Sequence, residues 1–240
     1  MVDVELDEGL AVITIDRPQA RNAIAPETMD QLSRALDAVA AARALVITGG
    51  GDRAFVSGGD LKQLAAIRTE EDAQAMAWRM RLLCDRIAAF PAPVIAALNG
   101  HALGGGAEVA VAADIRIAAA DVKIAFNQVS LAIMPAWGGA ERLAALVGHS
   151  QALLLAGTGT MLDAPAAERI GLVNRVVPRE SFEAEWRGLA RSLANRSAGE
   201  IKRVLAGASA EEAVAAFARL WVSDEHWAAA DALQQQRNNR

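Results

Sequence analysis

The fold is decided by the central stretch Asn99-Gly100-His101-Ala102-Leu103-Gly104-Gly105-Gly106-Ala107-Glu108. A short buried strand is predicted before it at residues 94–98, and the apolar run after the glycines predicts a helix to about residue 113. Glycine lets the main chain approach a ligand closely, and the unpaired N–H groups at a helix start favour negative charge. Glu108 lies three residues beyond Gly105 and therefore projects from nearly the same side of this helix. The stretch predicts an acid/base beside a place where an oxyanion forms, which suits enolate chemistry next to a carbonyl.

Two further segments belong to the same interpretation. One is the small-residue turn Ala54-Phe55-Val56-Ser57-Gly58-Gly59-Asp60-Leu61-Lys62, and the other runs from residues 124–128 to Pro135-Ala136-Trp137-Gly138-Gly139. The turn offers backbone N–H groups in the same way as the glycine cluster. If the two glycine loops face each other, their N–H groups form an oxyanion pocket. Glu108 lies on an otherwise apolar helix. A carboxylate in such surroundings is unfavourable unless it has a hydrogen-bonding or ionic partner, or a functional role.

Outward from this centre, short strands and helices recur over the first two thirds of the chain, and helices dominate the last third. Apolar runs predict strands at residues 2–6, 10–15, 44–48, 94–98, 115–119, 123–126 and 173–177. Helices are predicted at residues 26–41, 70–89 and through most of the chain beyond Gly138. This strand-strand-helix order predicts an α/β protein in which a wound sheet core is followed by a helical C-terminal part, with a boundary near residue 180.

The composition is that of a globular protein with a large core. Of 240 residues, 53% are hydrophobic and 22% are charged. The formal net charge of −5 predicts no general affinity for nucleic acid or an anionic membrane, and the apolar runs are too short to span a bilayer. The single Cys84 cannot form an internal disulfide, so we expect a cytoplasmic protein. The histidines have no metal-ligand spacing, and we expect no metal site.

Five ordered motifs give the sequence a resemblance to the crotonase, or enoyl-CoA hydratase/isomerase, superfamily. Residues 54–62 resemble the family's A-F-x-A-G-A-D-I-K, and residues 99–108 resemble N-G-x-A-x-G-G-G-x-E. Residues 17–24, 135–143 and 166–178 resemble R-P-x-x-x-N-A-L, P-x-x-G-G-x-x-R-L and A-x-x-x-G-L-V-x-x-V-V-P. The resemblance implies the crotonase (ClpP-like) fold of repeated ββα units, with residues 1–180 as the core and 181–240 as a helical trimerisation region.

The resemblance also implies a role for each matching residue. The backbone N–H groups of Gly59 and Gly105 would bind the oxygen of a thioester, and Glu108 would be the first of two catalytic glutamates. The substrate would be bordered by Arg21, Ala23, Ser57, Asp60, Leu61, Gly104, Pro135 and Trp137. The partner would be an acyl-CoA thioester, so that coenzyme A is part of the substrate and no cofactor is expected. The subunits would assemble as a homotrimer or a dimer of trimers.

The family's second glutamate lies twenty residues beyond the first, and Gln128 occupies that position here. A glutamine amide can hold water or a carboxylate by hydrogen bonds, but it cannot exchange a proton near neutral pH. Double-bond isomerisation, which relies mainly on the second position, is therefore disfavoured. We expect an enoyl-CoA hydratase-like lyase. The alternatives are a decarboxylase of methylmalonyl- or ethylmalonyl-CoA-type thioesters, which would form the enolate by loss of CO₂, and a non-catalytic acyl-CoA-binding subunit.

The sequence does not fix which aromatic residues line the acyl pocket. Trp78 and Trp137 either narrow the pocket or belong to the core, and His101 is interpreted as a packing or hydrogen-bonding residue rather than a base. His226 and Trp227 either close over the acyl chain or lie in a subunit contact. The length and branching of the acyl chain do not follow from these residues.

Overall fold

The computed structural model describes residues 1–238 and divides the chain into two compact units. The first unit spans Met1–Ala194, and the second begins at Asn195. The division lies beyond helix α7 (Phe182–Leu193), whereas the sequence predicted a boundary near residue 180. The reason is that α7 belongs to the first unit. It buries Phe182, Trp186 and Ala190, which are four residues apart on one face, and it packs against strands of the central sheet.

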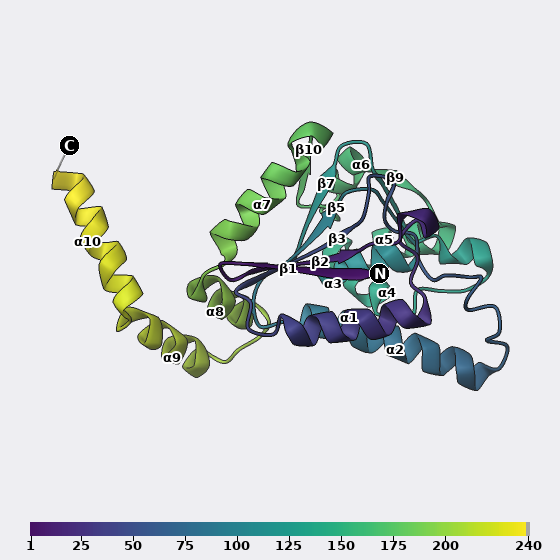
Figure 1. Ribbon diagram of the computed structural model, residues 1–240, viewed down its shortest axis with the longest axis horizontal. Coiled ribbons are helices and arrows are strands. Elements are labelled where there is room, and N and C mark those ends of the chain that lie inside the picture. Colours follow the sequence, from purple (N-terminus) through teal and green to yellow (C-terminus); the bar gives the residue numbers. More distant parts are fainter. Residues whose placement is uncertain (239–240) are drawn as a thin grey trace. The chain divides into compact units, whose positions relative to one another are not determined.

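A six-stranded sheet forms the centre of the first unit (Figure 1). Its strand order is β1-β2-β3-β5-β7-β10, with β1 antiparallel to β2 and every other pair parallel. The strands are β1 (Val2–Asp7), β2 (Leu10–Ile15), β3 (Ala44–Gly49), β5 (Val94–Leu98), β7 (Ile115–Ala119) and β10 (Arg175–Val177). Every residue of β3 and β5 is buried, as is usual for parallel strands that helices cover on both faces. The predicted strands are confirmed, with small differences at their ends.

Helices connect the parallel strands of this sheet. They are α1 (Pro26–Ala38) before β3, α2 (Glu70–Ala88) before β5 and α3 (Gly105–Ala112) before β7. Helices α1 and α2 lie side by side (Figure 1). The Thr69 hydroxyl caps α2 by accepting a hydrogen bond from the Asp72 N–H, which satisfies an otherwise unpaired donor. All residues of α3, Glu108 among them, are buried.

A second, smaller sheet brings together the three segments that the sequence analysis selected for the site. Its strands are β4 (Ala54–Val56), β6 (His101–Leu103), β8 (Lys123–Ala125) and β9 (Leu162–Asp163), in that order. Strands β4, β6 and β8 are parallel, so their carboxyl ends lie at one edge of the sheet. Residues 57–59 follow β4, residues 104–106 follow β6, and the short 3₁₀ helix η2 (Asn127–Leu131) follows β8. The three segments therefore meet at this edge.

The remaining elements of the first unit are mainly helical. They are the 3₁₀ turns η1 (Pro18–Ala20) and η3 (Arg179–Ser181) and the helices α4 (Gly139–Val147), α5 (His149–Thr158) and α6 (Ala164–Arg169). The predicted helical character beyond Gly138 is confirmed, and the order of strands, helices and helical C-terminal part is the α/β architecture that the sequence predicted. Among residues 1–238, no helix is both long and apolar enough to cross a membrane.

The second unit contains helices α8 (Arg196–Leu205), α9 (Ala210–Trp221) and α10 (Asp224–Asn238). A capping box between Ser209 and Glu212 starts α9, because each side chain accepts a hydrogen bond from the other's backbone N–H. The rings of Phe217, Trp221, His226 and Trp227 form one cluster with neighbouring centroids 4.6–5.7 Å apart. His226 and Trp227 thus contact the end of α9. Ala216 is the one buried residue of α8 and α9, so this unit has very little core of its own.

Candidate active site

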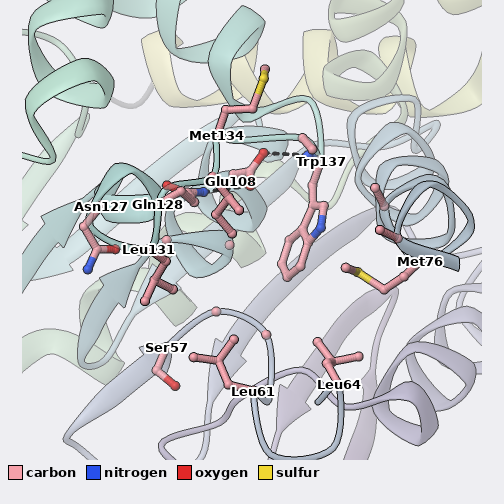
Figure 2. A pocket seen from close by; sticks show the side chains of 18 residues that line it. Ser57, Leu61, Leu64, Met76, Glu108, Asn127, Gln128, Leu131, Met134 and Trp137 are labelled. Atoms are coloured by element: carbon pink, nitrogen blue, oxygen red, sulfur yellow. Dashed lines mark hydrogen bonds between the residues drawn. The ribbon is translucent and has the colours of Figure 1, made fainter. Parts of the chain in front are cut away.

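A cavity of about 440 Å³ lies in the first unit, where the ends of β4, β6 and β8 meet helix α2 (Figure 2). Eight of the residues predicted for the site line it, namely Ser57, Gly59, Leu61, Gly104, Gly105, Glu108, Gln128 and Trp137. The other lining residues are mostly apolar and come from residues 58–64, from α2, from η2 and from the loop that follows η2. Figure 2 shows Ser57, Leu61 and Leu64 across the cavity from Glu108. The fold therefore brings together segments that are far apart in the sequence.

The two glycine loops approach each other closely. A β-carbon added at Gly58 would lie 3.4 Å from the backbone nitrogen of Gly105. At Gly106 an added β-carbon would lie only 1.8 Å from the carbonyl oxygen of Val56, so only glycine fits between α3 and β4. Within residues 1–238, the backbone N–H groups of Gly59 and Gly105 have no hydrogen-bond acceptor. Two such donors beside one cavity can stabilise a negatively charged oxygen.

Glu108 is the buried carboxylate of the cavity, with 2% of its surface exposed. Its Oε2 accepts hydrogen bonds from the backbone N–H of Trp137 at 2.7 Å and of Gly139 at 3.0 Å, and its Oε1 accepts one from Nε2 of Gln128 at 2.9 Å. Burial raises the pKa of the Glu108 carboxyl above its ordinary value, while the hydrogen bonds from Gly139, Trp137 and Gln128 act in the opposite direction. Burial is the largest of these effects, so the pKa of the Glu108 carboxyl remains above its ordinary value.

Gln128 lies beside Glu108, at the position that the sequence assigned to it. Its amide donates to Glu108, and its own Oε1 is buried with no hydrogen-bond partner among the described residues. Gln128 itself is 7% exposed and belongs to η2, which holds it directly after strand β8. An amide supplies hydrogen bonds but does not ionise near neutral pH. Glu108 and Gln128 are therefore hydrogen-bonded neighbours, but only Glu108 can take up or release a proton.

Trp137 is buried and forms a wall of the cavity. A β-carbon added at Gly105 would lie 2.0 Å from the indole ring, so the ring packs directly on the start of α3. Trp78 is 55% exposed and lies outside the lining, so neither the core nor the pocket expectation holds for it. Pro135 is buried and also lies outside the lining. Met76, Ala73 and Ala77 of α2 line the cavity instead, and their spacing along one helix face was the available sequence signal.

Asp60 and Ala23 lie outside the cavity and support its glycine loop. Asp60 forms an ion pair with Arg17 at 3.0 Å, and Arg17 also donates to the carbonyl oxygen of Ala23. The Ile24 N–H donates to Gly58 O, and the Asp60 N–H donates to Ile24 O, both at 2.8 Å. These bonds fix the loop on both sides of Gly59.

Asn22 has a structural role that sequence reasoning missed, although its motif had been identified. It is fully buried, and its Nδ2 donates to Gly50 O at 3.0 Å and to Ala54 O at 2.7 Å. Its Oδ1 accepts from the Arg17 N–H at 2.9 Å. Asn22 therefore ties the loop before α1 to both ends of the turn that leads into β4. The sequence signal for this role was an asparagine within the motif of residues 17–24.

A second, more polar cavity of about 520 Å³ adjoins the first, since Ser57 lines both. Arg21 lies here together with Arg53 and Arg179, two basic residues that the sequence analysis did not select. Arg179 is paired with Asp121, with Nη2 to Oδ1 at 2.5 Å. His101 accepts a hydrogen bond from the Lys123 N–H at 3.1 Å, which confirms its hydrogen-bonding interpretation. Among residues 1–238, no three His, Cys, Asp or Glu side chains are grouped closely enough to hold a metal ion.

The chain is similar in sequence to known proteins. The family model described as enoyl-CoA hydratase/isomerase matches residues 5–219. The crotonyl-CoA hydratase of Syntrophomonas wolfei is 40% identical over 215 residues, which are 87% of this chain and 80% of the relative. The short-chain-enoyl-CoA hydratase of Clostridium acetobutylicum is 35% identical over 198 residues, 81% of this chain and 74% of the relative.

The fold agrees as well. The crystal structure of an enoyl-CoA hydratase from Bacillus anthracis superposes with a TM-score of 0.91 and 28% identity, covering 98% of this chain and 96% of the other. A putative enoyl-CoA hydratase from Streptomyces coelicolor superposes with a TM-score of 0.88 and 29% identity, covering 98% of this chain and 91% of the other. With a buried carboxylate beside two glycine loops and a family match over most of its length, the chain belongs to the enoyl-CoA hydratase/isomerase family of the crotonase superfamily.

Proposed function

We propose that this chain is an enoyl-CoA hydratase, which adds water across the α,β-double bond of an acyl-CoA thioester. The observation that carries the proposal is Glu108, a buried carboxylate held at the same cavity as the unpartnered N–H groups of Gly59 and Gly105. The relatives named crotonyl-CoA and short-chain-enoyl-CoA hydratase support it. Glu108 is the base that takes a proton from water, and the two N–H groups bind the thioester oxygen as it becomes an enolate.

The two cavities divide the substrate between them in this proposal. The acyl chain lies in the first cavity, between α2 and the loop after η2, where the lining residues of both segments are apolar. The thioester lies where the two glycine loops meet. Coenzyme A passes Ser57 into the second cavity, where Arg21 and Arg53 offer guanidinium groups to its phosphates.

The lining of the first cavity favours hydration over decarboxylation of a malonyl-type thioester. None of its lining residues carries a positive charge. A free substrate carboxylate would therefore lie close to Glu108 without a cationic partner, which is costly in a buried site. An apolar enoyl chain has no such charge, and its one reacting partner, water, is neutral.

Hydration of crotonyl-CoA tests the proposal. We expect the purified chain to consume the enoyl thioester and to release no CO₂ from methylmalonyl- or ethylmalonyl-CoA. Glu108→Gln should lower kcat by roughly 10²–10⁴-fold, the usual contribution of a positioned acid/base. The same variant should bind butyryl-CoA, a saturated analogue, as tightly as the parent chain. No turnover with any of the three thioesters, together with retained butyryl-CoA binding, would identify a binding subunit instead.

Assembly, cofactor use and location complete the proposal. Helices α8–α10 expose many large apolar side chains and have little core of their own, which supports a homotrimer or a dimer of trimers built through this unit. Water and Glu108 supply the reacting groups, so we propose no cofactor beyond the coenzyme A of the substrate.

We propose a cytoplasmic location, with which a free and buried Cys84 is compatible. Burial raises the pKa of its thiol to about 12, and the thiol therefore stays protonated.

A further inference from the structure

We propose that this chain hydrates its substrate with a single carboxylate. Glu108 takes the proton from water and returns it to the α-carbon, while Gln128 holds Glu108 in its ionised form and exchanges no proton. This inference rests on the proposed hydratase function and concerns the same cavity. It assigns Gln128 as a positioning residue, which acts through Glu108 rather than through the substrate.

The first support is the set of groups that face the cavity. Among its lining residues, Glu108 is the only one whose side chain ionises near neutral pH, since the other polar side chains are Ser57, Asn127 and Gln128. Cys84 is buried outside the lining, and His101 lies at the second cavity. A second acid within reach of the reacting carbons is therefore absent from the lining, and one carboxylate has to serve both proton transfers.

The second support is the geometry of the pair. Nε2 of Gln128 lies 2.9 Å from Oε1 of Glu108, and this orientation leaves Oε1 of Gln128 buried without a partner in the described chain. An unpaired buried acceptor is unfavourable for stability. The opposite orientation of the amide would place two acceptors against each other whenever Glu108 is ionised. The contact with ionised Glu108 thus sets the orientation of the Gln128 amide, and it leaves Oε1 of Gln128 without a hydrogen bond.

The third support is the electrostatic effect on Glu108. Among residues 1–238, no cation forms an ion pair with this carboxylate. Its ionised form is stabilised by the backbone N–H groups of Trp137 and Gly139, with a further backbone contribution from Ala136, and by the amide of Gln128. The backbone donors are fixed by the start of α4 and the loop before it. The Gln128 amide is the donor that a substitution can remove. Without it, burial would act more strongly against the ionised form.

The atoms balance without another reactant. An O–H bond of water breaks, its proton passes to Glu108, and the oxygen forms a bond to the β-carbon. The π electrons move to the thioester oxygen, where Gly59 and Gly105 donate to the enolate. The enolate then collapses, and a C–H bond forms at the α-carbon with the proton from Glu108. The carboxylate is regenerated, and all atoms of the water are in the product.

The pH dependence of kcat/KM for crotonyl-CoA tests the inference. We expect a single rising limb for the parent chain, set by ionisation of Glu108, followed by a plateau. Gln128→Met, which keeps the length of the side chain and removes the donor, should move this limb to higher pH and lower kcat roughly tenfold or more at neutral pH. A merely structural role of Gln128 would leave the limb where it is, and that result would overturn the inference.

Gln128→Glu is the second variant. It adds an acid next to Glu108, so the two carboxyls share a proton and the profile should become bell-shaped, with a falling limb as that proton is lost. A parent chain that already shows the falling limb would contradict the single-carboxylate reaction. Circular dichroism and butyryl-CoA binding show whether each variant is folded. If the parent chain fails to hydrate crotonyl-CoA at any pH, the proposed function itself fails, which is a different result from an unshifted limb.

Discussion

Glu108 shows, at the scale of one residue, how the fold changes the properties of an ordinary carboxyl. Helix α3 surrounds it with glycine, alanine and valine, and only 2% of its surface is exposed. Burial penalises the charged form, and the N–H donors of Trp137, Gly139 and Gln128 reduce that penalty without removing it, since the pKa stays raised. The ionised form of Glu108 therefore lowers the stability of the folded chain, which fits the proton-transfer role proposed for this residue.

The first prediction follows from this cost and concerns Glu108→Gln. Because the folded state holds the Glu108 proton more tightly than the unfolded state, stability falls as the pH rises from about 4.5 through the raised pKa of the folded state. The variant has no carboxyl to ionise, and its amide can donate to the unpaired Oε1 of Gln128 after that side chain turns. We expect Glu108→Gln to be more stable than the parent chain at pH 7, by about 1.4 kcal/mol for each unit by which the pKa is raised.

Urea unfolding of both proteins between pH 4 and 8 measures this difference. The gap should be smallest near pH 4, where the carboxyl is protonated in both states, and should widen toward neutral pH. A gap that is constant over this range would show that the change acts through packing rather than through the charge.

The residues of the site could be predicted to different degrees. Glu108, Gln128 and both glycine loops were found because their motifs have fixed spacing, and all of them line one cavity. Asp60 and Ala23 belong to the same motifs but support the loop from outside, and spacing alone cannot separate a lining residue from a supporting one. Arg53 and Arg179 reach the second cavity through the fold rather than through a motif, so sequence reasoning did not select them.

At the scale of elements, strand length decided which strands could be predicted from the sequence. The short strands β4 and β6 were missed. Each has three residues between loops, too few for an alternating pattern to show, and neither was predicted. The longer buried strands of the main sheet were predicted because their apolar runs are unbroken. Yet β4, β6 and β8 are the strands that bring the chemical segments together. Their parallel pairing is a tertiary property, which a single strand's sequence does not contain.

Helix α2 carries the second prediction. Ala73, Met76 and Ala77 line the first cavity from one helix face, whereas the neighbouring Trp78 is exposed and does not line it. Ala77→Phe places a ring in the cavity and should lower kcat/KM for a ten-carbon enoyl-CoA at least tenfold more than for crotonyl-CoA. Overpacking a cavity wall costs roughly 1–3 kcal/mol, and the longer chain needs more of that space.

Steady-state kinetics with four- and ten-carbon trans-2-enoyl-CoA substrates measure the ratio. Trp78→Ala is the matched control on the same helix, and it should leave the ratio unchanged because its side chain does not line the cavity. An equal loss with both substrates in Ala77→Phe would place the acyl chain outside this cavity.

At the scale of the whole molecule, the two units differ in how they are stabilised. The first unit contains the buried core, including every residue of β3 and β5. The second exposes Leu205, Val214, Phe217 and Val222 by 61–82%, while α8 and α9 bury only Ala216. Exposed apolar side chains gathered on so few helices are typical of a surface that another protein covers. A second copy of this chain is the occupant that the predicted trimerisation region implies.

The last prediction tests that assembly. Val214 and Phe217 lie three residues apart on α9, and both are more than 60% exposed. If this face is a subunit contact, Val214→Glu buries an unpaired charge and should shift the protein from three or six times the mass of one chain toward a single chain. Ala215→Glu adds the same charge to the adjacent side of α9 and should leave the mass unchanged. Analytical ultracentrifugation at several concentrations measures both variants. A parent chain that sediments as a monomer, or two variants that behave alike, would show that this helix face makes no contact between subunits.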